Sequence, residues 1–236
     1  PLADPYLLGI AAGAGLGATV AITQDWGDGG GFTDPVPLAA FGGALLAVVL
    51  SYTAGHVGGR STASLILAGV AVASFLTAAQ TYVLQANSDA FREVYAWILG
   101  RIATSGWSEV VLMVPYFLLA AGIVFRYRRA LDVLAVGDEE AQALGLEPRK
   151  IRVIVVLAAS LGAAAAVSVS GLIGFVGIIV PHAVRLAFGA SHRVLVPLSI
   201  LFGGAFMVLA DLAARTIVEP AELPIGVVTA FLGAPF

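Results

Sequence analysis

The chain has 236 residues, of which 59% are hydrophobic and 11% are charged, and its mean hydropathy is +0.97. These values lie outside the range of soluble domains and indicate an integral membrane protein. The net charge of -3, without a basic run, argues against nucleic-acid binding, and the absence of cysteine from the sequence excludes disulfides and thiolate metal sites.

Apolar stretches of transmembrane type recur along the whole sequence. An α-helix needs about 20 residues to cross the hydrocarbon core of a bilayer. Eight candidate segments comprise residues 6–23, 36–54, 65–84, 110–125, 153–170, 172–184, 195–212 and 223–236. The sixth is too short to span alone, and the continuous apolar character disfavours the alternating strands of a β-barrel. The sequence therefore predicts an all-α, polytopic transmembrane helical bundle, with residues 1–236 as a single domain.

Glycines recur every four residues in the first segment, at Gly9, Gly13 and Gly17. Small residues at this spacing share one helix face and let helix backbones approach closely in lipid. Residues 13–18 also match a dinucleotide-binding fingerprint, but that motif requires a preceding strand in a soluble βαβ unit. The surrounding apolar run favours helix packing over nucleotide binding.

A polar and aromatic stretch, residues 89–100, follows the third segment. Its three charged residues precede Tyr95 and Trp97, and aromatic side chains of this kind are enriched at membrane interfaces. We expect a short helix that lies at the outer interface.

Residues 126–152 interrupt the apolar pattern and hold six of the twelve basic residues. Asp138 can cap a helix whose first turn holds two glutamates, where acidic side chains favour the positive end of the helix dipole. Gly145 and Pro148 are expected to end this helix.

The short helix in this stretch has a small apolar face. Ala141 and Leu144 are expected to share that face. A surface helix in a loop is the simpler interpretation, yet a loop of about 25 residues is long for a compact membrane protein, and such loops are often functional.

Gly171, Gly174 and Gly177 precede Pro181, which lacks an N–H and tends to break a helix. Irregular backbone at membrane depth is tolerated only where it is buried in protein or lines a cavity. We favour a packed half-helix over direct substrate contact.

Lys and Arg predict the orientation, because they are retained on the cytoplasmic side of short loops. If the first segment begins inside, nine basic residues fall inside and three outside. The inner set is Arg60, Arg126, Arg128, Arg129, Arg149, Lys150, Arg152, Arg185 and Arg193, and the outer set is Arg92, Arg101 and Arg215. Residues 126–152 are therefore expected to be cytoplasmic.

Seven blocks of the sequence resemble the FecCD-like permeases of type II ABC importers, which take up ferric siderophores, haem and cobalamin. The blocks are LADPYLLGI, LILAGVAV, WILGR, VGDEEAQALGL, SGLIGFVGIIVPHAVRL, SHRVLVP and ELPIGVVTAFLGAPF. They occur in the family's order, and the resemblance extends over essentially the whole chain.

The resemblance implies a fold of ten transmembrane helices in the cytoplasmic (inner) membrane, assembled as a homodimer or a close heterodimer around a central path. The eight segments would be helices three to ten, so the first two helices and the end of the last would be absent from this sequence. Independent folding of this piece is in doubt for that reason.

The resemblance also implies a coupling helix that seats on a separate ATP-binding subunit. Its residues would be Val136, Gly137, Asp138, Glu139, Ala141, Leu144 and Gly145. The sequence contains no Walker A motif, so ATP and Mg²⁺ are expected on the partner ATPase, and this chain is expected to bind no cofactor.

Further roles follow from the same resemblance. Arg60, Ser61, Thr62 and Ala63 match the cytoplasmic gate region of the family. Thr77 and Gln80 lie on the helix that matches the one lining the path, although burial between helices is an equal alternative.

Arg215 matches a position at which the family docks its periplasmic or lipoprotein substrate-binding protein. A charge pair there would align the two proteins and attract them. The alternatives are a snorkelling arginine at the interface, or an ion pair with Asp211 or Glu219.

Together these residues predict a permease subunit, not an enzyme, that moves an iron(III)-siderophore complex by alternating access; haem or cobalamin is the alternative cargo. An ion-coupled secondary transporter is a rival, but only Asp211 approaches the membrane-embedded ionisable group that it needs. A membrane hydrolase built on Ser170 and His182 lacks the motif around its nucleophile.

Overall fold

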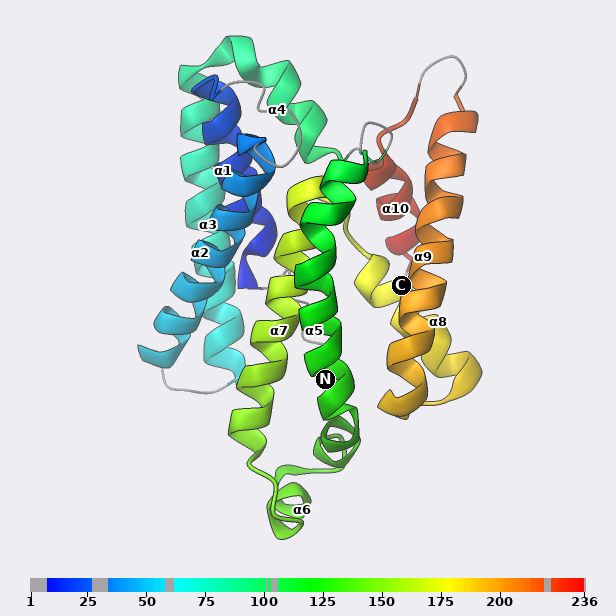
Figure 1. Cartoon of the computed structure of the whole chain (residues 1–236). Coiled ribbons are helices and arrows are strands. Elements are labelled where there is room, and N and C mark those ends of the chain that lie inside the picture. Colours follow the sequence, from blue (N-terminus) through cyan, green and yellow to red (C-terminus); the bar gives the residue numbers. More distant parts are fainter. Residues whose placement is uncertain are drawn as a thin grey trace. The chain divides into compact units, whose positions relative to one another are not determined.

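The computed structural model describes an all-helical chain (Figure 1). The described residues are 8–26, 34–57, 62–100, 102, 106–218 and 222–235. The α-helices are α1 (Ile10–Thr23), α2 (Pro35–Val57), α3 (Thr62–Ala86), α4 (Phe91–Ile98), α5 (Trp107–Leu134), α6 (Asp138–Ala143), α7 (Pro148–Ser170), α8 (Val176–Phe188), α9 (His192–Thr216) and α10 (Ile225–Gly233). A 3-10 turn, η3 (Ser88–Ala90), precedes α4.

Five of the described helices, α2, α3, α5, α7 and α9, are long and apolar enough to cross a bilayer. A helix satisfies its backbone hydrogen bonds internally, which is what a segment in lipid requires. The shorter helices α1, α8 and α10 account for the other three predicted segments. The predicted all-α, multi-pass membrane bundle is confirmed.

The contacts of the chain group into two compact units. We call residues 3–117 with 160–173 the first unit, and residues 118–159 with 174–236 the second unit. The long helices α5 and α7 contribute to both. The expectation of one domain over residues 1–236 stays a prediction.

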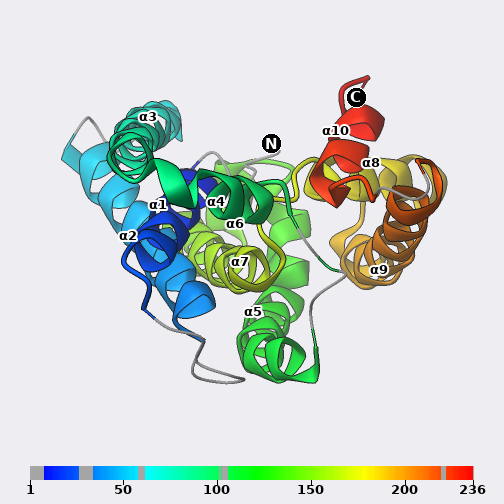
Figure 2. The same cartoon turned by 90° about the horizontal axis from the view of Figure 1, so that it is seen from above.

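In the first unit, α1 packs against α2 and α3, and the three helices lie side by side in both views (Figures 1 and 2). A Cβ atom on Gly13 would collide with the carbonyl oxygen of Gly43, and one on Gly17 with that of Ala39. The backbones of α1 and α2 are therefore in direct contact. The packing role predicted for the glycine repeat is confirmed for Gly13 and Gly17, whereas Gly9 is the N-cap of α1, with φ +79° and only ordinary van der Waals contacts.

Two polar contacts also join helices of the first unit. The Ser51 hydroxyl of α2 donates to the carbonyl oxygen of Leu8 at 2.9 Å, and the Gln80 amide of α3 donates to the Thr19 hydroxyl at 3.1 Å. Ser51 and Thr19 are fully buried. Hydrogen bonds of this kind stabilise helix association where hydrophobic burial gives no advantage over lipid.

Helix α4 is the short helix predicted from residues 89–100. It buries Val94 and Trp97 and exposes Phe91 and Tyr95, whose rings stack with centroids 5.6 Å apart. This two-sided pattern suits a helix that lies along an interface. The predicted helix is confirmed, and its position relative to a bilayer stays a prediction.

In the second unit, α8 and α9 form a hairpin around an apolar cluster. Val180, Val184 and Leu195 are its buried members, and Val176, Leu198 and Phe206 pack against them. Helix α10 contacts both α8 and α9. The Phe175 side chain occupies the space that a side chain at position 233 would need. This contact holds the start of α8 against the end of α10.

The break in the glycine-rich segment lies earlier than the sequence suggested. Pro181 is inside α8, and the irregular backbone spans 171–175 instead. Gly171 has φ +75°, and a Cβ there would collide with the carbonyl oxygen of Trp97, so this position needs glycine. The short, packed α8 fits the half-helix that we favoured.

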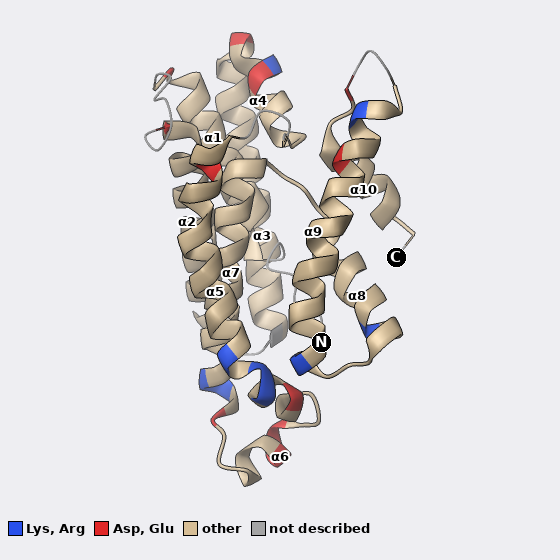
Figure 3. Cartoon of the chain, turned by 45° about the vertical axis from the view of Figure 1, so that its right-hand side comes forward, with Lys and Arg blue, Asp and Glu red and all other residues tan. Residues whose placement is uncertain are grey.

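Charged residues lie at the helix ends in Figure 3. In the second unit, Lys and Arg gather where α5 ends and α7 begins, on either side of α6. Helix α9 begins near this end of α5 and carries Arg215 at its other end. The basic residues around α6, predicted to be inside, and Arg215, predicted to be outside, therefore lie toward opposite ends of α9. This separation agrees with the predicted orientation.

Candidate functional site

The short helix α6 connects α5 to α7 in the sequence and lies beyond the ends of both helices (Figure 1). The sequence placed Asp138 at its N-cap, but the N-cap residue is Gly137, and Asp138 is the first helical residue. The Asp138 carboxylate makes no capping bond and instead accepts two hydrogen bonds from the Arg152 guanidinium of α7, one of them 2.8 Å long. This bidentate pair fastens the start of α6 to α7.

The end of α6 is a Schellman motif. Gly145 has φ +78°, its N–H donates to the carbonyl oxygen of Gln142 at 2.9 Å, and the Leu146 N–H donates to that of Ala141 at 2.9 Å. Gly145 therefore ends the helix as predicted. Pro148 does not end α6; it is the first residue of α7, a position that needs no N–H donor.

The apolar face predicted for α6 is not formed as expected. Ala141 is fully buried, whereas Leu144 at the C-cap is 70% exposed and Val136 is 75% exposed. The helix has only six residues, and Leu144 lies just beyond its last residue, Ala143. The first turn of α6 exposes its acidic residues. One exposed aliphatic side chain, Val136, precedes the helix, and another, Leu144, follows it.

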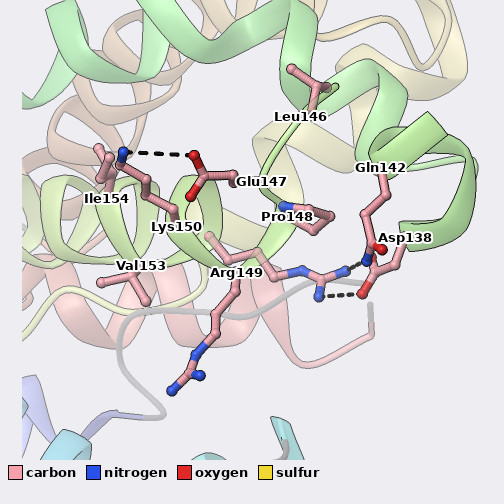
Figure 4. A pocket seen from close by; sticks show the side chains of 10 residues that line it. Asp138, Gln142, Leu146, Glu147, Pro148, Arg149, Lys150, Val153 and Ile154 are labelled. Carbon is pink, nitrogen blue, oxygen red and sulfur yellow. Dashed lines mark hydrogen bonds and ion pairs between the residues drawn. The ribbon is translucent and has the colours of Figure 1, made fainter. Parts of the chain in front are cut away.

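A shallow, open groove of about 750 Å³ lies between α6 and the first turns of α7 (Figure 4). Asp138 and Gln142 line it from α6, and Arg149 and Arg152 line it from α7. Lys150 reaches Glu147 at 3.9 Å, but both side chains are largely exposed, and such pairs contribute little to stability.

A second polar cluster, which sequence reasoning missed, ties the last turn of α5 to the first turn of α9. One Asp132 carboxylate oxygen accepts the His192 backbone N–H at 2.6 Å and lies 2.7 Å from the His192 Nδ1. The other oxygen accepts the Ser191 hydroxyl at 3.0 Å. We call Asp132, Ser191 and His192 the α5–α9 junction. In the sequence, Ser191 and His192 stood out only as part of the block SHRVLVP that resembles the family. No local spacing pattern links them to Asp132.

The residues of the predicted gate lie at the connection from α2 to α3. Arg60 and Ser61 are outside the described residues, Thr62 is the first residue of α3, and Ala63 is exposed. Close contact between Gly55 of α2 and Leu65 of α3 holds the two helix ends together. The gate role stays a prediction.

The predicted path residues have different environments. Gln80 faces α1, where its amide bonds Thr19 and fills the space that a side chain on Gly15 would need. Thr77 is exposed. For Gln80, this contact supports the alternative of burial between helices, while a role of either residue in a path stays a prediction.

Arg215 lies in the last turn of α9 and donates to the Asp211 carboxylate at 2.9 Å, one turn back along the same helix. This is one of the alternatives that the sequence left open; the other partner, Glu219, is outside the described residues. The Arg215 side chain remains partly exposed, so the pair leaves part of the guanidinium accessible.

Comparison with known proteins identifies the family. Residues 1–236 match the FecCD transport family. The chain belongs to this family. It is 42% identical over its whole length to an uncharacterized ABC transporter permease protein, YvrB, of Bacillus subtilis, and covers 67% of that protein. It is also 41% identical over its whole length to the cobalamin import system permease protein BtuC of Halobacterium salinarum, of which it covers 63%.

A solved structure extends the likeness to the fold. The inward-facing structure of a protein classed as a metal-chelate type ABC transporter superposes on the whole chain with a TM-score of 0.89 at 29% identity, and the chain covers 74% of it. The chain thus spans about two thirds of the length of the FecCD relatives that it matches. The resemblance stated from the seven sequence blocks is confirmed, and so is the helical permease fold.

Proposed function

We propose that this chain is the membrane-spanning part of a permease subunit in an ATP-driven importer. The observation that carries the proposal is α6: a short helix, fastened to α7 by the Asp138–Arg152 pair, that exposes Val136 and Leu144 between two apolar spans. The two exposed aliphatic side chains flanking α6 offer apolar surface that a protein partner can bury. Membership of the FecCD family makes an ATP-hydrolysing subunit the partner of choice.

The same proposal assigns a role to each subunit. The ATPase subunit binds ATP and Mg²⁺ and moves α6, and this chain converts the movement into alternating access without chemistry on the cargo. A second permease subunit completes the path, and a binding protein delivers the cargo at the end of α9 that carries Arg215. We place the assembly in the cytoplasmic membrane, with α6 inside.

For the cargo we propose an iron(III)-siderophore complex. One solved structure similar to this chain is of a protein classed as a metal-chelate type ABC transporter, and an iron-siderophore complex is a metal chelate. Cobalamin is the second candidate, because the Halobacterium salinarum relative named for cobalamin import is 41% identical. Both are large organic ligands that carry their metal already coordinated.

Uptake in cells tests this proposal. Cells deleted for the complete gene are compared with complemented cells for uptake of iron-55 presented as several ferric siderophores, with labelled cobalamin and haem in parallel. We expect the deleted cells to lose uptake of one ferric siderophore and the complemented cells to regain it. Loss of cobalamin uptake alone would make cobalamin the cargo and leave the importer function in place. Normal uptake of every compound would contradict the proposal.

A further inference from the structure

The α5–α9 junction joins two helices that do not otherwise pack along their lengths in the described part of the chain. The Asp132 carboxylate accepts hydrogen bonds from the His192 backbone N–H and the Ser191 hydroxyl, and the His192 ring lies against it. These residues are about 60 positions apart in the sequence, and Asp132 and His192 are partly buried. The connection is therefore a polar point of contact and not a broad interface.

The start of α9 depends on this contact. Ser191 occupies the N-cap of α9 but makes no capping hydrogen bond of its own. The first N–H groups of a helix lack partners within the helix, and a carboxylate near them also favours the positive end of the helix dipole. Asp132 supplies this acceptor from α5, so the position of the α9 start is set by the end of α5.

On one side of the junction, α9 does not move alone. The apolar cluster of Val180, Val184 and Leu195 joins α9 to α8. The Leu223 N–H donates to the carbonyl oxygen of Ala214 at 2.9 Å and joins the approach to α10 to α9. A displacement of the α9 start therefore reaches the three helices α8, α9 and α10.

On the other side, the junction is close to α6 along the chain. Asp132 is in the last turn of α5, and only residues 135–137 separate that helix from α6. The Leu131 and Val133 carbonyl oxygens accept the N–H groups of Ala135 and Val136, so the first two of these residues continue the α5 hydrogen bonding. A displacement of α6 is thus passed to the end of α5 through a short, bonded connection.

We propose that Asp132 is a positioning residue that transmits displacement of α6 to the α8–α9 pair, through its bonds to Ser191 and His192. This inference rests on the proposed function, because it requires α6 to be moved by an ATPase. The junction stays bonded throughout the cycle, as a link and not as a switch.

The first test measures the amount of cargo imported per ATP hydrolysed by the complete, reconstituted transporter. Asp132→Ala removes the acceptor, and we expect this ratio to fall roughly tenfold, within the range of measured couplings between sites. Asp132→Asn keeps one acceptor for the His192 N–H and should give a smaller fall. Asp89→Ala, which removes an exposed carboxylate from the first unit, should leave the ratio unchanged.

A covalent replacement of the junction separates transmission from local stability. The printed sequence has no cysteine, so an Asp132→Cys/His192→Cys variant can be cross-linked selectively once cysteines elsewhere in the transporter are replaced. Reduced, the variant should be uncoupled like Asp132→Ala; oxidised, it should regain most of the wild-type ratio. Failure to cross-link, or loss of transport on oxidation, would overturn the inference.

The outcomes also separate this inference from the proposed function. A wild-type transporter without ATP-dependent uptake would refute the proposed function itself. If the wild type transports and Asp132→Ala keeps its ratio of cargo to ATP, the importer stands and the junction is only structural. Should Asp132→Ala fail to accumulate in the membrane, the Asn variant and the cross-linked pair still decide the question.

Discussion

Single residues decide how closely the helices of this chain approach. The glycine spacing in α1 predicted close packing because the period of four puts small residues on one face. The partner could not be predicted, since Gly43 and Ala39 lie in a later helix with no local signal that links them to Gly13 and Gly17. The same is true of Asp132, whose partners are about 60 residues away.

Substitution of Gly13 should be far more costly than substitution of Gly42. In Gly13→Ala, the new methyl group would meet the Gly43 carbonyl and lie 2.7 Å from the Ala47 Cβ, whereas Gly42 has nothing within 4 Å. Overpacking of this kind costs about 1–3 kcal/mol. Thermal unfolding of the complete protein in detergent should show a lower midpoint for Gly13→Ala and an equal or slightly higher one than wild type for Gly42→Ala. Equal midpoints would contradict the close packing of α1 on α2.

A substitution at Gln80 distinguishes its two possible roles. Gln80→Leu removes the bond to Thr19, and interhelical hydrogen bonds of this type average about 0.6 kcal/mol in membranes. If Gln80 is structural, the variant unfolds at a lower temperature and transports normally. Thr19→Val should then lower the unfolding temperature less in the Gln80→Leu background than in the wild type, because both substitutions remove the same hydrogen bond. Unchanged stability with impaired transport would assign Gln80 to the path.

At the scale of elements, the sequence predicted which helices exist better than where they end. Hydropathy predicted residues 110–125 and 153–170, but α5 continues to Leu134 and α7 begins at Pro148. Hydropathy locates the boundary of the lipid, whereas arginine and leucine continue a helix readily beyond it. The polar connection of about 25 residues is therefore mostly helix, and residues 135–147 with α6 remain between α5 and α7.

Leu144 is the sharpest test of α6 as a coupling element. Leu144→Asp places a charge where an exposed leucine would enter an apolar site on the ATPase. Transport should fall at least roughly tenfold while the protein still inserts, since this side chain makes no buried contact within the chain. Ser88→Asp, the same charge at an exposed position of η3 in the first unit, is the control. Wild-type uptake by the Leu144 variant would argue against docking at this helix.

The role of Arg215 can be tested while an ion pair is kept in α9. Arg215→Asp combined with Asp211→Arg reverses the pair, so the helix keeps an ion pair at i, i+4 spacing. If Arg215 docks a binding protein through that protein's carboxylates, the reversed variant should bind it several-fold more weakly, most clearly at low salt. Binding equal to that of the wild type at low salt would leave Arg215 as a partner of Asp211 alone.

For the whole molecule, composition and periodicity predicted the multi-pass helical class, and the sequence blocks predicted the FecCD family. The grouping of the chain into two compact units was not predictable, because α5 and α7 each contribute to both, and a continuous helix shows no boundary in its sequence. In the site, the glycine that ends α6 was the feature most open to prediction, and in the fold the helix after residue 89 was, since both depend on local signals.

The central claim is that this chain moves a metal chelate at the expense of ATP hydrolysed by another subunit. The most direct measurement is uptake of the ferric siderophore into proteoliposomes that contain the complete permease, its ATPase and the binding protein. We expect accumulation with ATP and Mg²⁺, and none with a non-hydrolysable analogue or without the ATPase. Accumulation driven by an ion gradient in the absence of ATP would contradict the claim and favour a secondary transporter.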